Sequence, residues 1–274
     1  MSAAERDFLT VTGARAVTTI CIDRPHVLNA IHPPLHRALE AAFDEFAGDP
    51  SRRICVLTGA GDRAFCVGSD LKYVAARRAA GDSEILTRLP AHGYGGLAQR
   101  FDLGKPVIAA VNGLALGGGF ELALACDLII AADTARFGLP EVNVGGFAHN
   151  GGAARLARHM PLKRAMAMLL TGDTIDAHEA LDLGLVNEVV PLADLGQATR
   201  RWCDRLLAGA PMAMALAKQA TLRGLDVPGI AAAMLRQPDY PEYKAWLAAD
   251  EVTEGATAFA QGRAPRWRRE AEGQ

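Results

Sequence analysis

Residues 109–122 constrain the fold more than any other stretch; they read Ala109-Ala-Val-Asn-Gly-Leu-Ala-Leu-Gly-Gly-Gly-Phe-Glu-Leu122. An apolar run typical of a strand precedes the glycines, and a helix-forming run, residues 120–125, follows them. Such a turn presents backbone N–H groups, reinforced by the helix dipole, to a developing negative charge. A dinucleotide site is not favoured because G-x-G-x-x-G is absent, nor is a phosphate loop, because no Lys-Ser/Thr follows the glycines. Glycines that only permit tight helix packing are the alternative interpretation.

A second glycine segment, residues 63–72, could supply a partner for that turn; it reads Arg-Ala-Phe-Cys-Val-Gly-Ser-Asp-Leu-Lys. Its glycine again follows a strand-like run, so Ser69 could contribute a second N–H donor. Two N–H groups from different loops form an oxyanion hole. Residues 69–72 also match the S-x-x-K pattern of Ser nucleophiles, but the accompanying S-D-N and K-T-G elements are missing. An oxyanion hole is therefore favoured over a Ser nucleophile.

Two carboxylates lie near these glycines. Glu121 is in the first turn of the expected helix, and Glu141 follows Phe137-Gly-Leu-Pro140. Each lies in or beside an uncharged, Gly-rich stretch, where an acid faces a cleft more often than it does on a solvated helix face. Two carboxyl groups around one water could activate it and move a proton to an adjacent carbon. No metal is expected, because two prolines separate His32 from His36 and H-E-x-x-H is absent.

The surrounding chain has the βα rhythm of an α/β protein. Strands are expected at 17–22, 54–58, 107–111 and 127–131, with an amphipathic helix at 34–47. From about residue 153 the pattern is almost wholly helical, with prolines marking the breaks. The predicted organisation is a core at residues 1–205 followed by a helical region at 206–274.

Composition excludes several classes of protein. The chain has 274 residues, 50% hydrophobic and 22% charged, with 29 Lys and Arg against 31 Asp and Glu. These are the proportions of a globular enzyme, and a net charge of -2 gives no reason to expect a nucleic-acid partner. The basic tail residues Arg263, Arg266, Arg268 and Arg269 are the one local exception. Five widely spaced cysteines form no C-x-x-C pair, which favours buried thiols over disulfides or zinc.

Membrane insertion and export are not expected. The longest uncharged stretch, residues 106–120, is too short for a span and contains four glycines. The N-terminal residues include acids and show no apolar leader. The sequence therefore predicts a cytoplasmic protein without a membrane partner.

The chain resembles the enoyl-CoA hydratase/isomerase (crotonase) family over nearly its whole length. Seven motifs occur in that family's order: Asp23-Arg-Pro25 with Asn29-Ala30, Ala64-Phe-Cys-Val-Gly-Ser-Asp-Leu71, Val111-Asn-Gly-Leu-Ala-Leu-Gly-Gly-Gly119, Phe137-Gly-Leu-Pro-Glu141, Leu170-Thr-Gly172, Gly184-Leu-Val-Asn-Glu188 and Glu254-Gly-Ala-Thr-Ala-Phe259. The resemblance implies a spiral of ββα repeats, a C-terminal helical region used for trimerisation, and a homotrimer or homohexamer.

It also implies an acyl-CoA thioester substrate, coenzyme A being part of the substrate and no separate cofactor being needed. The thioester oxygen would lie between the N–H groups of Ser69 and Gly118. The residues expected to contact the rest of the substrate are Leu28, Ala30, Gly68, Asp70, Leu71, Lys72 and His149. The acyl pocket would be lined by residues 73–97, Phe147 and His149.

Hydratases of this family carry both glutamates, which here are Glu121 and Glu141. The favoured reaction is therefore syn addition of water to an α,β-unsaturated acyl-CoA, or its reverse. A double-bond isomerase and a CoA-thioester hydrolase are the enzymatic alternatives, and a CoA-binding or RNA-associated protein without activity is the third. His149 stands where a glycine is usual, as a pocket residue, as an additional acid or base, or only as a histidine hydrogen-bonded beside the Gly-rich loop. Gln261-Gly-Arg263 replaces the common E-K-R, and Lys72 or the C-terminal arginines could replace its lysine near CoA.

Overall fold

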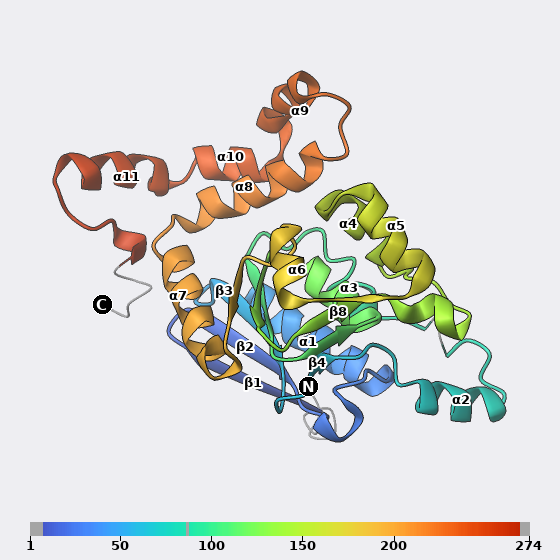
Figure 1. Cartoon of the computed structure of the whole chain (residues 1–274). Coiled ribbons are helices and arrows are strands. Elements are labelled where there is room, and N and C mark those ends of the chain that lie inside the picture. The colour runs from blue at the N-terminus through green and yellow to red at the C-terminus, as the bar shows by residue number, and fades with distance from the viewer. Residues whose placement is uncertain (1–7, 86–87, 269–274) are drawn as a thin grey trace.

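A six-stranded, mostly parallel β-sheet is the larger of two sheets in the protein (Figure 1). The computed structural model describes residues 8–85 and 88–268. The strand order is β1-β2-β3-β5-β7-β10, and only the β1–β2 pair is antiparallel. The inner strands are apolar runs, and β5 is buried along its whole length, as parallel sheets covered on both faces require. The strands are β1 (Leu9–Ala14), β2 (Val17–Ile22), β3 (Ile54–Gly59), β5 (Val107–Val111), β7 (Leu128–Ala132) and β10 (Glu188–Val190).

A second, four-stranded sheet has the order β4-β6-β8-β9. Its first three strands are parallel, and β9 (Thr174–Asp176) pairs antiparallel with β8. These strands are β4 (Ala64–Cys66), β6 (Leu114–Leu116) and β8 (Arg136–Gly138).

The chain alternates between the two sheets and then enters a helix. In this way β3 leads to β4 and α2 (Leu71–Ala79), and β5 leads to β6 and α3 (Gly118–Ala125). The next turn runs from β7 through β8 and the short helix η4 (Pro140–Val144) to α4 (Gly152–His159). The predicted α/β spiral of ββα repeats is confirmed, and successive turns place the starts of α2 and α3 close together.

Each face of the large sheet has its own apolar core. Helix α1 (Pro33–Gly48) buries Leu35, Leu39, Phe43 and Phe46 on one face, together with α3 and the small sheet. Helix α7 (Leu195–Leu207) covers the opposite face with a smaller cluster. Because side chains alternate along a strand, Cys55 and Leu57 belong to the first core and Ile54 and Val56 to the second. Full burial of each Leu or Phe is worth roughly 1.5–3 kcal/mol.

The region after residue 153 is less uniformly helical than expected. Besides α5 (Leu162–Thr171), α6 (Ala177–Asp182) and the short helix η5 (Leu192–Asp194), it contains strands β9 and β10. The expectation of an almost wholly helical segment was wrong there, because each strand has only three residues and is held by a strand far away in sequence. Phe137 pairs with Ile175, and Ile130 with Glu188.

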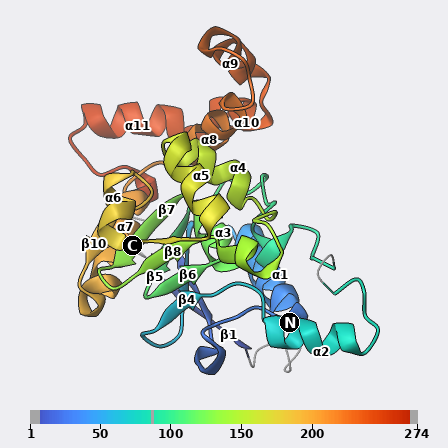
Figure 2. The same ribbon diagram turned by 45° about the vertical axis from the view of Figure 1, so that its right-hand side comes forward.

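The main helices after α7 in the described part of the chain lie apart from the sheets in both views (Figures 1 and 2). They are α8 (Pro211–Gly224), α9 (Ile230–Arg236), α10 (Pro241–Leu247) and α11 (Asp250–Ala260), with the short helix η6 (Gln237–Asp239) between α9 and α10. Many large apolar side chains on them are exposed: Leu222, Leu225, Ile230, Met234, Leu235, Leu247, Val252 and Phe259. The division into 1–205 and 206–274 and the trimerisation role of the second part stay predictions.

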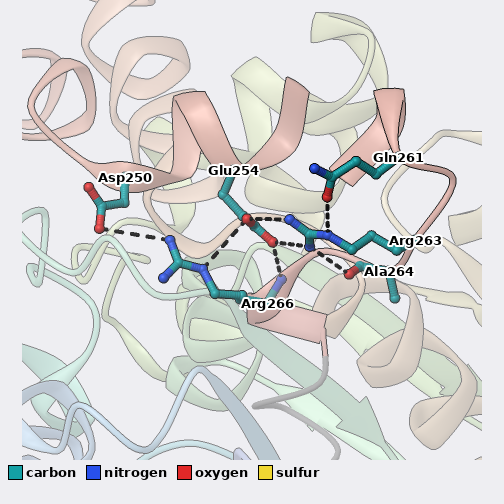
Figure 3. Close-up of polar contacts among 6 residues, drawn as sticks. All are labelled: Asp250, Glu254, Gln261, Arg263, Ala264 and Arg266. Carbon is teal, nitrogen blue, oxygen red and sulfur yellow. Dashed lines mark hydrogen bonds and ion pairs between the residues drawn. The ribbon is translucent and has the colours of Figure 1, made fainter. Parts of the chain in front are cut away.

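The chain after α11 turns back along that helix around Glu254, as Figure 3 shows. Both carboxylate oxygens of Glu254 accept hydrogen bonds from the Arg263 guanidinium, at 2.7 and 3.0 Å. The backbone N–H of Arg266 donates to the same carboxylate at 2.7 Å. These charge-assisted bonds lower the pKa of Glu254 to about 2, with the Arg263 hydrogen bonds as the largest cause. Arg263 and Arg266 therefore hold the C-terminal segment of their own chain.

Some expectations concern the chain termini and the cysteines. Residues 1–7 and Arg269 lie outside the described residues. Within the described ranges, the model contains no helix of the length and apolarity that a membrane span requires. All five cysteines are free thiols, and four of them are buried.

Candidate active site

The first helical N–H of α3 belongs to Gly118. Gly117 precedes the helix with φ +53°, a left-handed conformation that suits glycine. Gly119 packs so closely on β4 that a Cβ atom there would overlap the Cys66 carbonyl. The N–H groups in the first turn of a helix have no intrahelical acceptor, so the Gly118 N–H is available to a ligand.

Ser69 is positioned by a parallel β-bridge with Ile31. Ile31 N–H donates to the Gly68 carbonyl at 2.7 Å, and Asp70 N–H donates to the Ile31 carbonyl at 2.9 Å. Because its two neighbours make these bonds, Ser69 directs its own N–H away from Ile31.

Gly68 connects the two N–H groups in space. Its φ is +88°, and a Cβ built on it would lie 2.9 Å from the Gly118 nitrogen. The backbones of residues 68–69 and 117–118 therefore touch, although almost fifty residues separate them in sequence. Two N–H groups at such a junction can receive the oxygen of a polarised carbonyl group.

Glu121 lies one turn into α3 and is 1% exposed. Its Oε1 atom accepts a hydrogen bond from the Gly152 N–H at 2.9 Å, which ties α3 to the start of α4. Burial raises the pKa of the Glu121 carboxyl, and hydrogen bonds from Gly152 and Asn150 oppose that rise. A raised pKa makes a carboxyl group a better proton acceptor once it is ionised.

Glu141 is positioned by η4, which begins at Pro140 and ends in a left-handed Gly145. Its Oε1 lies 3.2 Å from the point where a Cβ on Gly117 would stand, so the carboxylate reaches the start of α3. Its Oε2 atom is buried and has no hydrogen-bond partner among the described residues. An unsatisfied buried carboxylate oxygen costs free energy unless a ligand or water binds it.

The two carboxyl groups influence one another. Burial is the largest cause of the raised pKa of Glu141, and the charge of Glu121 raises it further. His149, which is exposed, acts in the opposite direction on both carboxyl groups. Its Nδ1 lies 3.1 Å from the Phe147 carbonyl, beside the Gly-rich loop. The negative charge of Glu121 therefore favours the protonated form of Glu141.

The other predicted substrate contacts range from buried Ala30 through half-buried Leu28 and Asp70 to exposed Leu71 and Lys72. The Arg24 guanidinium donates to the Asp70 carboxylate at 3.1 Å and to the Ala30 carbonyl at 2.5 Å. Asp70 and Ala30 therefore support the loop before α2. Leu28, in the left-handed region, accepts a hydrogen bond from Val67 N–H at 3.3 Å. Leu71 and Lys72 are exposed in the first turn of α2 and lie open to a ligand.

Metal-ligand geometry is absent from the described part of the chain. No group of three His, Cys, Asp or Glu side chains in residues 8–85 and 88–268 is arranged to bind an ion. His32 and His36 are buried, and burial lowers the pKa of each to about 4.

Tyr94 is the site residue that sequence reasoning did not single out. It is 2% exposed, its hydroxyl lies 3.3 Å from Ser69 Oγ, and its ring fills the space beside Gly118. The sequence signal was an aromatic residue inside Gly93-Tyr-Gly-Gly96, within the segment expected to line the pocket. Asn150 and Gly152, which hydrogen-bond Glu121, were also missed.

Comparisons with known proteins find relatives over nearly the whole chain. The model of the enoyl-CoA hydratase/isomerase family matches residues 12–270. A carnitinyl-CoA dehydratase of Proteus mirabilis is 40% identical over 262 residues, covering 95% of this chain and 98% of the relative. The crystal structure of an enoyl-CoA hydratase from Mycobacterium marinum superposes with a TM-score of 0.85 at 34% identity, covering 94% and 98% of the two chains. One from Bacillus anthracis gives 0.85 at 31% identity, covering 96% and 99%.

Proposed function

Because the chain belongs to the enoyl-CoA hydratase/isomerase family and is a hydro-lyase, we propose that it interconverts an α,β-unsaturated acyl-CoA and its 3-hydroxyacyl-CoA. The observation that carries the proposal is the pair Glu121 and Glu141. Both carboxyl groups have a raised pKa, and both lie next to the glycine turn that presents the Gly118 N–H.

The reaction begins with polarisation of the thioester. The carbonyl oxygen accepts hydrogen bonds from the N–H groups of Ser69 and Gly118, which makes the β-carbon electrophilic. Removal of one such donor typically costs about 10²- to 10³-fold in rate. The dipole of α3 adds to the stabilisation of the enolate oxygen.

The two carboxyl groups then move protons without changing the proton count of the pair. One carboxylate takes a proton from the bound water as the water oxygen bonds to Cβ. The other carboxyl group, protonated at the start, gives its proton to Cα. The pair holds one proton before and after the reaction, and water adds to one face of the double bond.

The test follows loss of the conjugated-thioester absorbance of crotonyl-CoA with wild-type protein and Glu141→Gln. Glu45→Gln is the matched control, because Glu45 is exposed on the surface of α1. Rapid loss in the wild type and in Glu45→Gln, with at least about 10²-fold slower loss in Glu141→Gln, is the expected result. Release of free CoA thiol, or migration of the double bond without hydration, would instead assign a hydrolase or an isomerase.

A second candidate concerns the acyl group, because several relatives are named carnitinyl-CoA dehydratases. Phe147 is 70% exposed, and its ring centroid lies 5.4 Å from that of His149. The charge of His149 lowers the pKa of both Glu121 and Glu141, so Phe147 lies near the two carboxyl groups. An exposed aromatic face can bind a quaternary ammonium group with about 0.5–2 kcal/mol. We propose carnitinyl-CoA as a substrate for dehydration on this basis.

Comparison of kcat/KM for carnitinyl-CoA and 3-hydroxybutyryl-CoA tests that candidate. Phe147→Leu should lower the first value by about 2- to 30-fold and leave the second unchanged. An equal effect on both substrates would contradict it. The homotrimer or homohexamer also stays a proposal, supported by the exposed apolar side chains of α8–α11 and testable by light scattering.

A further inference from the structure

Tyr94 lies beside the backbone of Gly118 and beside the side chain of Ser69, the two residues whose N–H groups would hold the thioester oxygen. A Cβ built on Gly118 would overlap Cζ of the Tyr94 ring and lie 2.6 Å from its hydroxyl. The same hydroxyl lies 3.3 Å from Ser69 Oγ. One side chain therefore spans the junction between the start of α3 and the loop before α2.

The backbone around Tyr94 is held by contacts with α1. Gly95 N–H donates to His36 Nδ1 at 3.0 Å, and the His36 ring meets the Tyr94 ring edge-to-face with centroids 4.6 Å apart. Glu40 Oε1 accepts a hydrogen bond from His92 N–H and lies 3.0 Å from His92 Nδ1. Gly95 has φ +60°, which a larger residue at that position would adopt only with strain.

The two contacts of Tyr94 differ in strength. A distance of 3.3 Å is long for a hydroxyl–hydroxyl hydrogen bond, for which about 2.7–2.8 Å is usual. The ring, in contrast, fills all the space beside Gly118 and leaves no room for a methyl group. The ring should therefore contribute more than the hydroxyl to the position of the Gly118 N–H.

We propose that Tyr94 is a positioning residue that sets the separation of the Ser69 and Gly118 N–H groups, and through it the polarisation of the bound thioester. The inference rests on the proposed function, because it assigns these N–H groups to the thioester oxygen. Misplacement of such donors by less than an ångström weakens catalysis while leaving the rest of the binding surface intact.

The test uses butyryl-CoA labelled with ¹³C at the thioester carbonyl, which cannot be hydrated because it has no double bond. The infrared carbonyl frequency should fall when it binds to the wild type. Tyr94→Leu should lose most of that fall and lower kcat for crotonyl-CoA about 10²-fold, with KM changed less than about 3-fold. Tyr94→Phe should keep most of the fall and lose less than about 10-fold in kcat.

Controls separate this role from a general structural one. Tyr243→Leu, in α10, should leave both readouts unchanged. If Tyr94→Leu fails to fold, Tyr94→Met, whose flexible unbranched side chain also lacks the planar ring, takes its place with the same expected loss. Ser69→Ala combined with Tyr94→Phe should be no slower than the slower single variant, because both changes remove the same contact.

Several results would overturn the proposal. A folded Tyr94→Leu or Tyr94→Met protein with the full frequency shift would show that Tyr94 does not set the N–H groups. Additive effects of Ser69→Ala and Tyr94→Phe would show that the hydroxyl acts directly on substrate. No frequency shift in the wild type would refute the oxyanion site itself and this proposal with it. A shift without hydration of crotonyl-CoA would refute the hydratase reaction alone.

Discussion

Gly68→Ala is the sharpest single-atom test of the N–H pair. Gly68 has φ +88°, and its added Cβ would lie 2.9 Å from the Gly118 nitrogen. Gly81 provides a matched control, because its φ is +89° and a Cβ there would meet no atom within 4 Å. The two substitutions impose the same backbone strain, but only the first places a methyl group between the two donor segments.

The magnitudes follow from these two facts. An alanine in the left-handed region costs roughly 1–2 kcal/mol, so both variants should lose about that much stability. The Cβ–nitrogen contact in Gly68→Ala is several tenths of an ångström too short and meets backbone, so the two segments must separate. Displacement of one oxyanion donor should then lower kcat about 10²- to 10³-fold.

The assay combines urea unfolding with steady-state hydration of crotonyl-CoA for both variants. We expect Gly68→Ala to lose at least as much unfolding free energy as Gly81→Ala, and a large loss of kcat only in Gly68→Ala. Wild-type turnover in a stably folded Gly68→Ala protein would refute the assignment of the oxyanion site. Equal loss of turnover in Gly81→Ala would show that strain, and not the donor geometry, is responsible.

Three further predictions concern the carboxyl groups. Glu121→Gln and Glu141→Gln should each lower kcat by at least about 10²-fold, while CoA-ester affinity, measured by calorimetry, stays nearly constant. In the wild type, the acid limb of the kcat/KM profile should lie above pH 4.5, because the pKa values of both carboxyl groups are raised. Glu121→Gln should also stabilise the fold, and urea unfolding should show a larger gain at pH 8 than at pH 5. The reason is that the pKa of Glu121 is higher in the folded than in the unfolded state, so the wild type loses stability as pH rises from 4.5 through the folded-state pKa. An equal gain at both pH values would contradict this. Glu254→Gln should speed amide hydrogen exchange in residues 263–268 at pH 7 and leave the exchange rates in α1 unchanged, because Glu254 accepts hydrogen bonds from the Arg263 side chain and the Arg266 N–H. Unchanged exchange in residues 263–268 would contradict the anchoring role.

The sequence predicted elements whose cause is local. The helix expected at 34–47 spans Pro33–Gly48, and the strand expected at 17–22 is β2. Proline at the start and buried Leu and Phe at helical spacing are sufficient for the first, and β-branched alternation for the second. β9 and β10 could not be found in this way, because three residues carry no periodicity and partners on β8 and β7 determine both strands.

The candidate site shows the same limit. Gly118 and Glu121 follow from one local strand–glycine–helix pattern. A second N–H donor at Ser69 was proposed from another glycine segment and supported by the family resemblance, but the Ile31 bridge that places Ser69 joins segments far apart in sequence and has no local signal. The position of Tyr94 depends on how its glycine loop packs on α1, so no local pattern could predict it. The catalytic roles of these residues stay predictions.

The different attachments of the two glutamates bear on how new reactions could arise on this scaffold. Glu121 is tied into the structure, because its carboxylate also holds the Gly152 N–H. Glu141 stands on a short helix followed by exposed residues, and its Oε2 has no protein partner in the described chain. We expect a random substitution at 141 to change the chemistry and leave the architecture intact, whereas most substitutions at 121 other than Gln would also remove the acceptor of the Gly152 N–H. We expect position 141 to be the more evolvable of the two, and the better starting point for redesigning the reaction.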